Sequence, residues 1–417
     1  MSKGGDRRER IMREAAAHFL QDGFERTSMD RIAASAKVSK QAIYEHFRDK
    51  EDLFDRVVRA ALSPGGKGGL VERDSLCETL AAFAERQFDG FAKPRNYGLF
   101  RANIVATRRF PQLAADLHDY RRSKSYGLAA YLERCVAAGR LQPFAESPLD
   151  FATRLGGMAV EGSRYFLGYK VPGRQQRQIQ ARFATRVFCD GMRDASAHAS
   201  VGLDPQPPFV PAPAEPPGKV QMRMPPERFD ALCNAAADEF LAHGFEGASL
   251  DPITAATNVG RATIYRQFGG KAGLFAHTIG REIAAQWREL DQPTGATPLE
   301  QLENLCRTVL ELHLAPRSLA LHYLLVQESD LFPELARSFY DMQVDRAGRP
   351  FACIAESAGI ATPVPAVTRM FFALASYGVR YVVSLRPVAQ EERETVSRQA
   401  AHIILHGIAG AAAREAQ

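Results

Sequence analysis

The sequence lacks several features that would place the chain in other classes of protein. No apolar run reaches the ~18 residues that a membrane-spanning helix needs, and the N-terminal SKGGDRRER is polar, which predicts neither a membrane span nor a signal peptide. The six cysteines are widely spaced and form no CxxC pair, a pattern typical of reduced thiols in a cytoplasmic protein. The net charge is only +5, so any surface that binds phosphate must be concentrated in one region.

The sequence also lacks the motifs of common enzyme and metal-binding classes. It contains no GxSxG motif, phosphate-binding loop, HExxH motif or paired-cysteine motif. His402 and His406 have the i, i+4 spacing of two zinc ligands on a helix, but no acidic or cysteine third ligand lies nearby in the sequence. We therefore expect no enzyme activity, no metal site and no cofactor.

Proline is concentrated in residues 201–226, which contain nine prolines in 26 positions. Because proline fixes φ and has no backbone donor, this segment is expected to form an extended, semi-rigid linker. At about 3.1 Å per residue, such a linker could span roughly 75 Å. Two DNA half-sites one helical turn apart are separated by only about 34–36 Å, so the joined parts could bind one duplex side by side.

The most informative feature is a repeat: residues 10–54 recur at 231–275, without a gap, at a constant offset of 221, and 18 of the 45 positions are identical. The identical pairs include Gly23/Gly244, Phe24/Phe245, Ile43/Ile264, Tyr44/Tyr265, Phe47/Phe268 and Lys50/Lys271. Weaker matches continue beyond it, such as 110–113 with 332–335 and 153–155 with 368–370. Each half is therefore predicted to be a complete unit, duplicated and diverged.

Apolar residues outside the linker recur at helical spacing, and no strand pattern is present, which predicts an all-α fold. In the first copy, a first helix over 7–22 is expected to stop at Gly23, and Thr27 offers the N-cap of a second helix that ends near Ala36. Ser39 is expected to cap a third helix. The outer side of this helix carries the residues Lys40, Gln41, Ala42, Tyr44 and His46. This size and chemistry suit a DNA major groove of about 12 Å.

The segment GFERTSMDRIAASAKVSKQAIYEHFRDKEDLF resembles the helix-turn-helix of the TetR (tetracycline-repressor) family of bacterial regulators, and GFEGASLDPITAATNVGRATIYRQFGGKAGLF resembles it with departures. The resemblance implies two TetR-like units in tandem, each with a three-helix DNA-binding domain and a helical ligand-binding and dimerisation domain. The expected parts are a first helix-turn-helix domain (1–62), a first regulatory domain (71–197), a linker (198–226), a second helix-turn-helix domain with its connecting helix (227–290) and a second regulatory domain (292–417).

The resemblance also implies which residues contact double-stranded DNA. Phosphate contacts are expected from Tyr44 and Lys50, and from Tyr265 and Lys271. The base-facing set is expected to be Lys40, Gln41, Ala42 and His46 in the first copy, and Arg261, Ala262, Thr263 and Gln267 in the second. The hydroxyls expected at helix N-termini, where backbone N–H groups bind phosphate, are those of Thr27 or Ser28, Ser39 and Ser249.

The second copy departs from the pattern at three places. Ala248 replaces Thr27 and Pro252 replaces Arg31, so the cap is expected to move to Ser249 and the helix to start one residue later. The pair 269–270 is Gly-Gly, which is expected to loosen the connection to the next helix. Residues 219–275 hold six charges of each sign, whereas residues 1–60 hold 13 Lys/Arg against 11 Asp/Glu. We therefore expect the first module to bind phosphate better.

The predicted function is a ligand-responsive transcriptional regulator of the cytoplasm, a repressor, that binds an operator with two half-sites. The sequence does not identify the small-molecule effector, and an apolar or aromatic compound is the default. Segments 148–170 with 174–195, and 363–386 with 390–414, match the expected dimerisation helices. Either the two halves pair as a single-chain pseudo-dimer or whole chains form a homodimer. In the alternative hypothesis, the chain is a sensor or adaptor whose second module serves packing or a protein partner.

Overall fold

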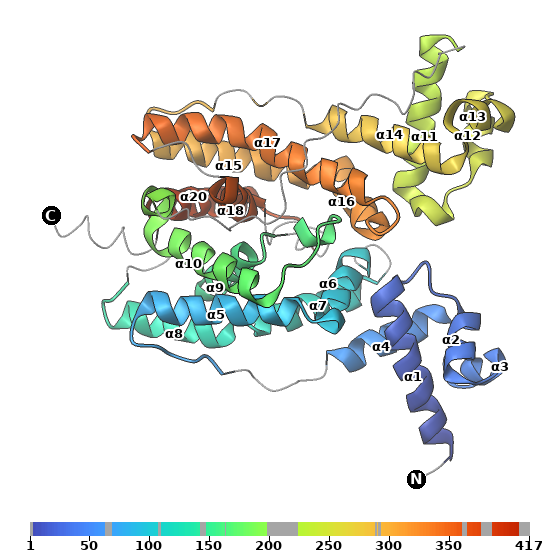
Figure 1. The fold of residues 1–417 in the computed structure, drawn as a ribbon, viewed down its shortest axis with the longest axis horizontal. Coiled ribbons are helices and arrows are strands. Elements are labelled where there is room, and N and C mark those ends of the chain that lie inside the picture. Colours follow the sequence, from blue (N-terminus) through green and yellow to red (C-terminus); the bar gives the residue numbers. More distant parts are fainter. Residues whose placement is uncertain are drawn as a thin grey trace. The chain divides into compact units, whose positions relative to one another are not determined.

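The computed structural model describes residues 3–62, 69–106, 110–141, 147–162, 164–197, 224–287, 290, 293–360, 365–376 and 386–407 (Figure 1). Over these residues the regular elements are α-helices and one short 3-10 helix, with no strand, which confirms the predicted all-α class. Most of the expected linker, residues 198–223, lies outside the described ranges. None of the described helices is both long and apolar enough to cross a membrane.

The chain divides into two compact units that do not coincide with the two halves of the repeat. The first unit comprises Met1–Val160, Gly173–Thr185 and Tyr381–Val388. The second unit comprises Glu161–Pro172, Arg186–Arg380 and Ala389–Gln417. The second unit therefore includes two segments from the first half of the sequence.

The first unit contains the first DNA-binding module and most of the helices that follow it. Its helices are α1 (Lys3–Asp22), α2 (Met29–Ala36), α3 (Lys40–Tyr44), α4 (Lys50–Ala61), α5 (Leu76–Phe91), α6 (Pro94–Ala106), α7 (Pro111–Ser123), α8 (Tyr126–Ala137), α9 (Pro148–Ala159) and the first half of α10 (Arg174–Ala197). Side-chain caps define several of their starts: the hydroxyls of Ser75 and Ser147 each accept a hydrogen bond from a backbone N–H in the first turn.

The second unit repeats this order of helices. Its elements are η1 (Arg164–Phe166), the end of α10, α11 (Pro226–Gly247), α12 (Leu250–Thr257), α13 (Arg261–Phe268), α14 (Lys271–Gln286), α15 (Pro298–Leu314), α16 (Pro316–Glu328), α17 (Pro333–Ser357), α18 (Pro365–Ser376) and α20 (Gln390–His406). The helix α15 packs along both α18 and α20, and α17 packs on α15.

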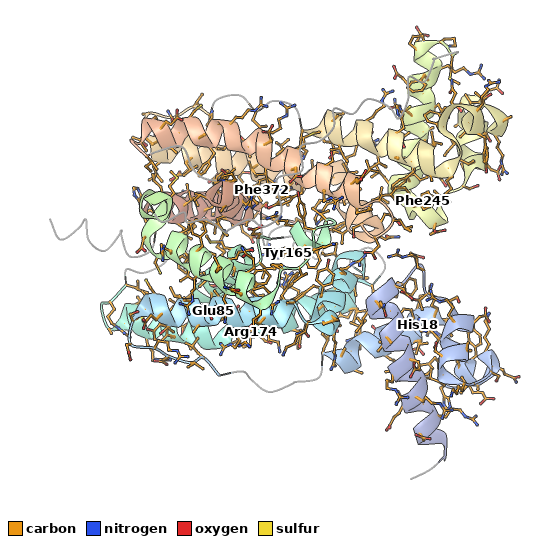
Figure 2. All side chains as sticks on the ribbon, in the orientation of Figure 1. His18, Glu85, Tyr165, Arg174, Phe245 and Phe372 are labelled. Carbon is orange, nitrogen blue, oxygen red and sulfur yellow. The ribbon has the colours of Figure 1, made fainter. Side chains whose placement is uncertain are left out.

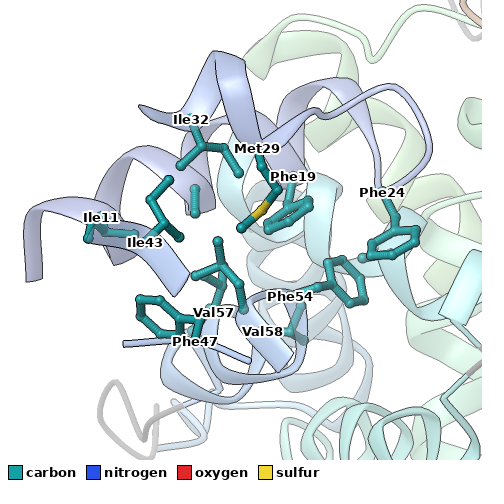
Figure 3. Packing of buried hydrophobic residues seen from close by; sticks show 14 of the residues in the cluster. Ile11, Phe19, Phe24, Met29, Ile32, Ile43, Phe47, Phe54, Val57 and Val58 are labelled. Atoms are coloured by element: carbon teal, nitrogen blue, oxygen red, sulfur yellow. The ribbon is translucent and has the colours of Figure 1, made fainter. Parts of the chain in front are cut away.

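The core of the first DNA-binding module, part of which is drawn in Figure 3, is continuous with the helices of the adjoining domain. Phe54 lies edge-on to Phe19 and Phe24, with ring centroids 5.2 and 5.1 Å apart, and Phe110 before α7 lies 5.5 Å from Phe24. The backbone of α6 at Gly98 approaches α1 so closely that a Cβ there would lie 2.8 Å from the Cβ of Leu20. A shift of α6 or α7 must therefore move the DNA-binding module or break this core.

The second DNA-binding module is attached in the same way. Phe275 lies 5.0 Å from Phe240 and 5.2 Å from Phe245, and Phe332 before α17 lies 4.4 Å from Phe275, centroid to centroid. Phe332 corresponds to Phe110 of the first copy at an offset of 222. Both modules therefore share a core with the helical domain that follows them.

The first of the predicted dimerisation helices is shorter than expected. The helix expected over 148–170 ends at Ala159, because Glu161 and Gly162 have φ values of 52° and 61°, in the left-handed region that stops an α-helix. In the second half α18 covers residues 365–376, and residues 377–385 lie outside the described part of the chain. The connecting helix α14 ends at Gln286, and Trp287 follows it directly.

Candidate nucleic-acid interface

Both copies form a helix-turn-helix with the same turn. The residue that ends the second helix is in the left-handed conformation in each copy: Lys37 with φ 52° after α2 and Asn258 with φ 51° after α12. The N–H of Lys37 donates to the carbonyl groups of Ala33 and Ala34, which closes the helix before the chain turns into α3. The third helices α3 and α13 are therefore presented by equivalent turns.

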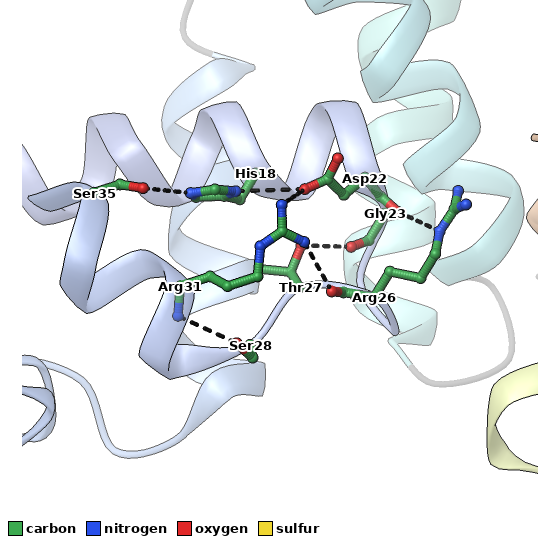
Figure 4. Close-up of polar contacts among 8 residues, drawn as sticks. All are labelled: His18, Asp22, Gly23, Arg26, Thr27, Ser28, Arg31 and Ser35. Atoms are coloured by element: carbon green, nitrogen blue, oxygen red, sulfur yellow. Dashed lines mark hydrogen bonds and ion pairs between the residues drawn. The ribbon is translucent and has the colours of Figure 1, made fainter.

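The N-cap of α2 is Ser28, and the prediction that Thr27 caps this helix is wrong. The Ser28 hydroxyl accepts a hydrogen bond from the Arg31 N–H at 3.2 Å (Figure 4). Thr27 is only 1% exposed, and its hydroxyl donates to the Gly23 carbonyl at 2.7 Å. Because this hydroxyl is buried against the end of α1, it is not placed to contact phosphate. The half-exposed Ser28 stands at the helix N-terminus, where an anion is favoured.

A polar network ties α1 to α2 in the first module (Figure 4). The Asp22 carboxylate lies 2.8 Å from Nη2 of Arg31 and 3.4 Å from Nδ1 of His18, and the other ring nitrogen of His18 lies 2.8 Å from the Ser35 hydroxyl. These contacts set the angle between the two helices. They join positions that carry no local motif, so the sequence alone does not identify them.

The second module replaces this network with a different one. Glu239, which corresponds to His18, accepts a hydrogen bond from the Ser249 N–H at 2.9 Å. Ser249 is the N-cap of α12, as predicted, and its hydroxyl accepts from the Asp251 N–H at 3.2 Å. The expected later start is wrong, because α12 begins at Leu250, the equivalent of Met29. Pro252 thus falls in the first turn, where its missing donor costs little.

The third helix of the first module exposes part of the expected base-facing set. Lys40, Gln41 and Tyr44 are exposed, and His46 is half-buried. Ala42 is only 7% exposed, so the prediction that it lies on the outer side of this helix is wrong. The reason is helical spacing: Ala42 shares the inner face with Ile43 and Phe47, which fill the core. Ser39 fixes this orientation as the N-cap of α3, because its hydroxyl accepts from the Ala42 N–H at 3.1 Å.

The third helix of the second module is longer than its counterpart. Gly269 has φ 74°, and its N–H donates to the Tyr265 carbonyl at 2.9 Å, which ends α13 at Phe268. Gly270 has φ 125°, and a Cβ there would lie 3.3 Å from the Tyr265 ring. The two glycines therefore form a defined helix end instead of the loosened connection that we expected. Among the expected contact residues, Arg261, Ala262 and Tyr265 are exposed, and Thr263 and Gln267 are half-buried.

The two lysines expected to contact phosphate have the same surroundings. The Lys50 ammonium donates to the Glu25 carbonyl at 3.3 Å and lies 4.3 Å from the centroid of the Phe24 ring. Lys271 donates to the Glu246 carbonyl at 3.2 Å and lies 5.1 Å from the ring of Phe245. Each ammonium is thereby held beside the loop that precedes the second helix of its module.

An exposed ion pair at the start of the third helix also recurs. Nζ of Lys40 lies 3.0 Å from the Asp30 carboxylate, and this hydrogen bond raises the pKa of Lys40, so the ammonium is charged at neutral pH. Arg261 pairs with Asp251 at the equivalent positions. Exposed pairs of this kind contribute little to stability, so DNA phosphate can replace the carboxylate at little cost.

The attachment of the second module includes charged contacts that the sequence did not reveal. Arg317 of α16 donates to Glu282 of α14 and to Asp238 of α11, with each N–O distance 2.7 Å. Glu328, buried at the end of α16, accepts from the Phe245 N–H at 3.2 Å. These partners are far apart in the chain and carry no motif, so only the tertiary structure identifies them.

No cluster of three metal-ligating side chains occurs among the residues that the structure describes. The ring centroids of His402 and His406 lie 5.2 Å apart on α20.

Comparison with known proteins identifies both modules. Residues 11–57 and 232–278 each match the family model for bacterial regulatory proteins of the tetR family. The two modules therefore resemble the DNA-binding domains of tetR-family regulators. Two matches in one polypeptide agree with the tandem duplication inferred from the repeat. The two tetR-family matches fall on the segments that form α1 to α4 and α11 to α14.

The similar proteins are regulators by name, and the similarity is concentrated at the DNA-binding modules. An uncharacterized HTH-type transcriptional regulator, YhgD of Bacillus subtilis, is 40% identical over 57 residues, which cover 14% of this chain and 30% of the relative. The HTH-type transcriptional regulator TcmR of Streptomyces glaucescens is 29% identical over 140 residues, which cover 31% of this chain and 59% of TcmR. The chain thus matches less than two thirds of the length of each of these two relatives.

A tetR-family protein of known structure also aligns with the chain. It is a putative transcriptional regulator from Mesorhizobium loti, 24% identical, with a TM-score of 0.38. The alignment covers 45% of this chain and 96% of that protein.

Proposed function

We propose that the chain is a ligand-responsive transcriptional regulator of the cytoplasm, a repressor, whose two DNA-binding modules occupy the two half-sites of one operator as a single-chain pseudo-dimer. The observation that carries DNA binding by both halves is the matching presentation of their third helices. Tyr44 and Tyr265 are 46% and 58% exposed, and Lys50 and Lys271 have the same partners in each copy.

This match favours two working DNA-binding modules over the alternative in which the second serves only packing. In a module that no longer bound DNA, we would not expect a large aromatic side chain such as Tyr265 to stay exposed on the third helix. It would have no reason to keep Arg261 at the start of that helix either. The replacements at 248, 252 and 269–270 are each accommodated by local structure, as the Ser249 cap and the Gly269 helix end illustrate.

Pairing of the two halves is supported by a reciprocal contact between the end of α10 and the end of α20, and the residues in contact all belong to the second unit. A Cβ at Gly191 would lie 2.7 Å from the Leu405 carbonyl oxygen, and a Cβ at Gly407 would overlap the backbone of Cys189. Gly191 and Gly407 correspond in the repeat at an offset of 216. Cys189 and Leu405 correspond at the same offset, so the two close contacts are reciprocal, as a two-fold interface within one chain would require.

A buried ion cluster supports the same pairing. Glu161, from the first half of the sequence, is 1% exposed, and its carboxylate lies 2.6 Å from Nη1 of Arg164 and 3.4 Å from Nε of Arg369, from the second half. Burial alone would raise the pKa of Glu161, but the two guanidinium groups outweigh it and hold the pKa below its ordinary value. The carboxylate is therefore ionised, and it joins segments that are far apart in sequence.

The ligand response follows from how the modules are attached. Because each module shares its core with α6 and α7, or with α16 and α17, a ligand that favours one packing of those helices also favours one orientation of the module. We propose that the unliganded orientation fits the operator and that the liganded one does not.

The proposal is tested with an operator selected in vitro from random duplexes, by comparing affinity and salt dependence of variants. Tyr44→Phe and Tyr265→Phe should each weaken binding about tenfold, the loss of one hydrogen bond to a charged group. Lys50→Gln and Lys271→Gln should each reduce the slope of log affinity against log salt by about 0.9.

The matched control is Tyr126→Phe, because Tyr126 is as exposed as Tyr265 (56% against 58%) but lies on α8. This variant should bind the operator like the parent chain. If Tyr265→Phe and Lys271→Gln also leave affinity, salt slope and footprint unchanged, the second module does not bind DNA and the adaptor hypothesis replaces the proposal.

A further inference from the structure

We propose that the helical domain of the second half holds a binding site for an uncharged aromatic molecule with hydrogen-bonding groups, built around Trp287, Tyr340 and Gln343. The inference rests on the ligand response proposed above and specifies its chemistry. It assigns the site to one half of the chain, so that the two halves differ in what they sense.

Three buried polar side chains carry the inference. Gln343 of α17 is completely buried, and neither its amide nitrogen nor its amide oxygen has a hydrogen-bond partner among the residues that the structure describes. The same holds for the Tyr340 hydroxyl and the Trp287 indole nitrogen, whose residues are 3% and 1% exposed. Native proteins rarely leave such groups without partners, because each costs its full desolvation penalty.

These side chains lie around a shared aromatic cluster. The ring of Phe372 on α18, labelled in Figure 2, lies 6.1 Å from Trp287 and 5.9 Å from Tyr340, centroid to centroid. His313 of α15 lies 5.0 Å from Phe372 and 5.2 Å from Trp287. Gln343 follows Tyr340 by three residues on α17, so both lie on the same face of that helix. Residues on α15, α17 and α18, and Trp287 at the end of α14, therefore converge.

The chemistry of the partner follows from these groups. The indole N–H, the phenol and the amide NH₂ donate hydrogen bonds, and the amide oxygen accepts one, so the partner must carry acceptor oxygens and at least one donor. Four aromatic rings favour a planar aromatic body. Burial comes first among the causes that raise the pKa of Tyr340, so its hydroxyl stays protonated and able to donate.

The partner is uncharged because Glu161, the ionised carboxylate on this side, already pairs with two guanidinium groups, and burial raises the pKa of Asp341, which favours its neutral form. Glu161 is bonded to Arg164 and Arg369, and the Asp341 carboxylate accepts a hydrogen bond from the Tyr169 hydroxyl. A charged ligand would have to be buried with no counter-charge of its own, which is costly.

The first half does not repeat this arrangement. At an offset of 222, Tyr340 and Gln343 correspond to His118 and Arg121, and His313 corresponds to Phe91. Nη2 of Arg121 lies 3.4 Å from Nδ1 of His118, so these two polar groups contact each other. The buried polar groups are thus specific to the second half. Such a difference between the halves is expected where one of two duplicated sensor domains has kept or gained a ligand.

The test uses the intact chain, whose only tryptophan is Trp287, so its fluorescence reports on this site alone. The probe is 6-hydroxy-2-naphthamide, with 6-hydroxy-2-naphthoate as the charged analogue of equal size. We expect calorimetry to show saturable binding of the amide to one site per chain, with a parallel change in Trp287 emission. Binding of the carboxylate should be at least tenfold weaker. Gln343→Met and Tyr340→Phe should weaken binding of the amide at least tenfold.

The melting temperatures of two variants provide an independent test of whether the Gln343 amide lacks partners within the protein. Gln343→Met removes buried polar groups that the protein does not satisfy, so it should raise the melting temperature. The matched control is Gln180→Met, because Gln180 is also buried but donates to the Ala159 carbonyl at 3.4 Å, and this variant should lower the melting temperature.

The proposal is overturned if the amide does not bind, or binds equally well to Gln343→Met, or if that variant is destabilised as Gln180→Met is. Those results would mean that the three groups belong to a hydrated or tightly packed core. Operator affinity of the same variants without probe separates the two proposals. Normal DNA binding with no probe binding removes this site only, whereas probe binding with no DNA binding removes the proposed function and leaves the site.

Discussion

Glu161 is a buried carboxylate whose two oxygens each contact a guanidinium group, one of Arg164 and one of Arg369. Removing the charge leaves two buried cations without their counter-ion. We expect Glu161→Gln to lower the free energy of unfolding by about 3–5 kcal/mol, measured as a shift in the urea midpoint at neutral pH. Glu72→Gln is the control, because its pair with Arg134 is about half exposed and should contribute under ~1 kcal/mol. Equal midpoints for the two variants would contradict the prediction.

The lowered pKa of His118 leads us to expect that the stability of the fold depends on pH. Burial, followed by the charges of Arg121 and Arg122, lowers the pKa of His118 from 6.5 to about 4. Between these values the unfolded chain binds a proton that the folded chain does not, so stability must fall as the pH is lowered from 6.5 to about 4. His118→Gln should flatten this part of the profile of melting temperature against pH. If the variant loses stability as steeply as the parent chain, His118 is not the group responsible.

At the scale of helices, the contact between α10 and α20 depends on two glycines. Gly191→Ala should lower the melting temperature more than a left-handed φ alone explains, because the added Cβ also meets the backbone at Leu405. We expect a loss of about 1–3 kcal/mol beyond the conformational cost. The control that isolates this cost is Gly359→Ala, where φ is +70° and no atom lies within 4 Å of the added Cβ. Equal losses would mean that the helices separate easily.

How far the sequence could predict each element depends on whether its cause is local. Ser39 and Ser249 were predictable as caps, because a hydroxyl before a helix satisfies nearby N–H groups whatever surrounds it. Thr27 and Ser28 are adjacent hydroxyls that suit the same role, and burial of Thr27 against Gly23 decides between them. Whether Ala42 faces inward likewise depends on the rotation of α3 about its own axis as it packs against the core.

The end of α9 shows the same limit over a longer range. Nothing in residues 148–170 other than its glycines forecasts a stop at Ala159, since Glu161 adopts its left-handed conformation while bonded to Arg164 and, 208 residues further on, to Arg369. Partners at that distance leave no periodic or spacing signal in a single sequence. The candidate ligand site is of the same kind, because Trp287, Tyr340 and Gln343 come together only through packing.

For the whole molecule, fusing both halves in one chain changes how DNA binding should depend on concentration. A dimer of separate subunits falls apart on dilution, so its operator binding becomes steeper and weaker as the protein concentration drops below the dimer dissociation constant. A pseudo-dimer held by its own backbone carries both modules at any concentration. We therefore expect a binding isotherm with a Hill coefficient of 1 and one 45.9 kDa chain per operator duplex in native mass spectrometry.

The selected operator should itself carry the asymmetry of the chain. Because the third helices present Lys40 and Gln41 in one half and Arg261 and Ala262 in the other, the two half-sites should differ in sequence while lying about one helical turn apart. Replacing Arg261 with Lys and Ala262 with Gln should convert the preferred operator into a palindrome. The number of chains bound per operator should not change. A perfect palindrome bound by two parent chains would instead mean that one module per chain contacts DNA and that intact chains dimerise.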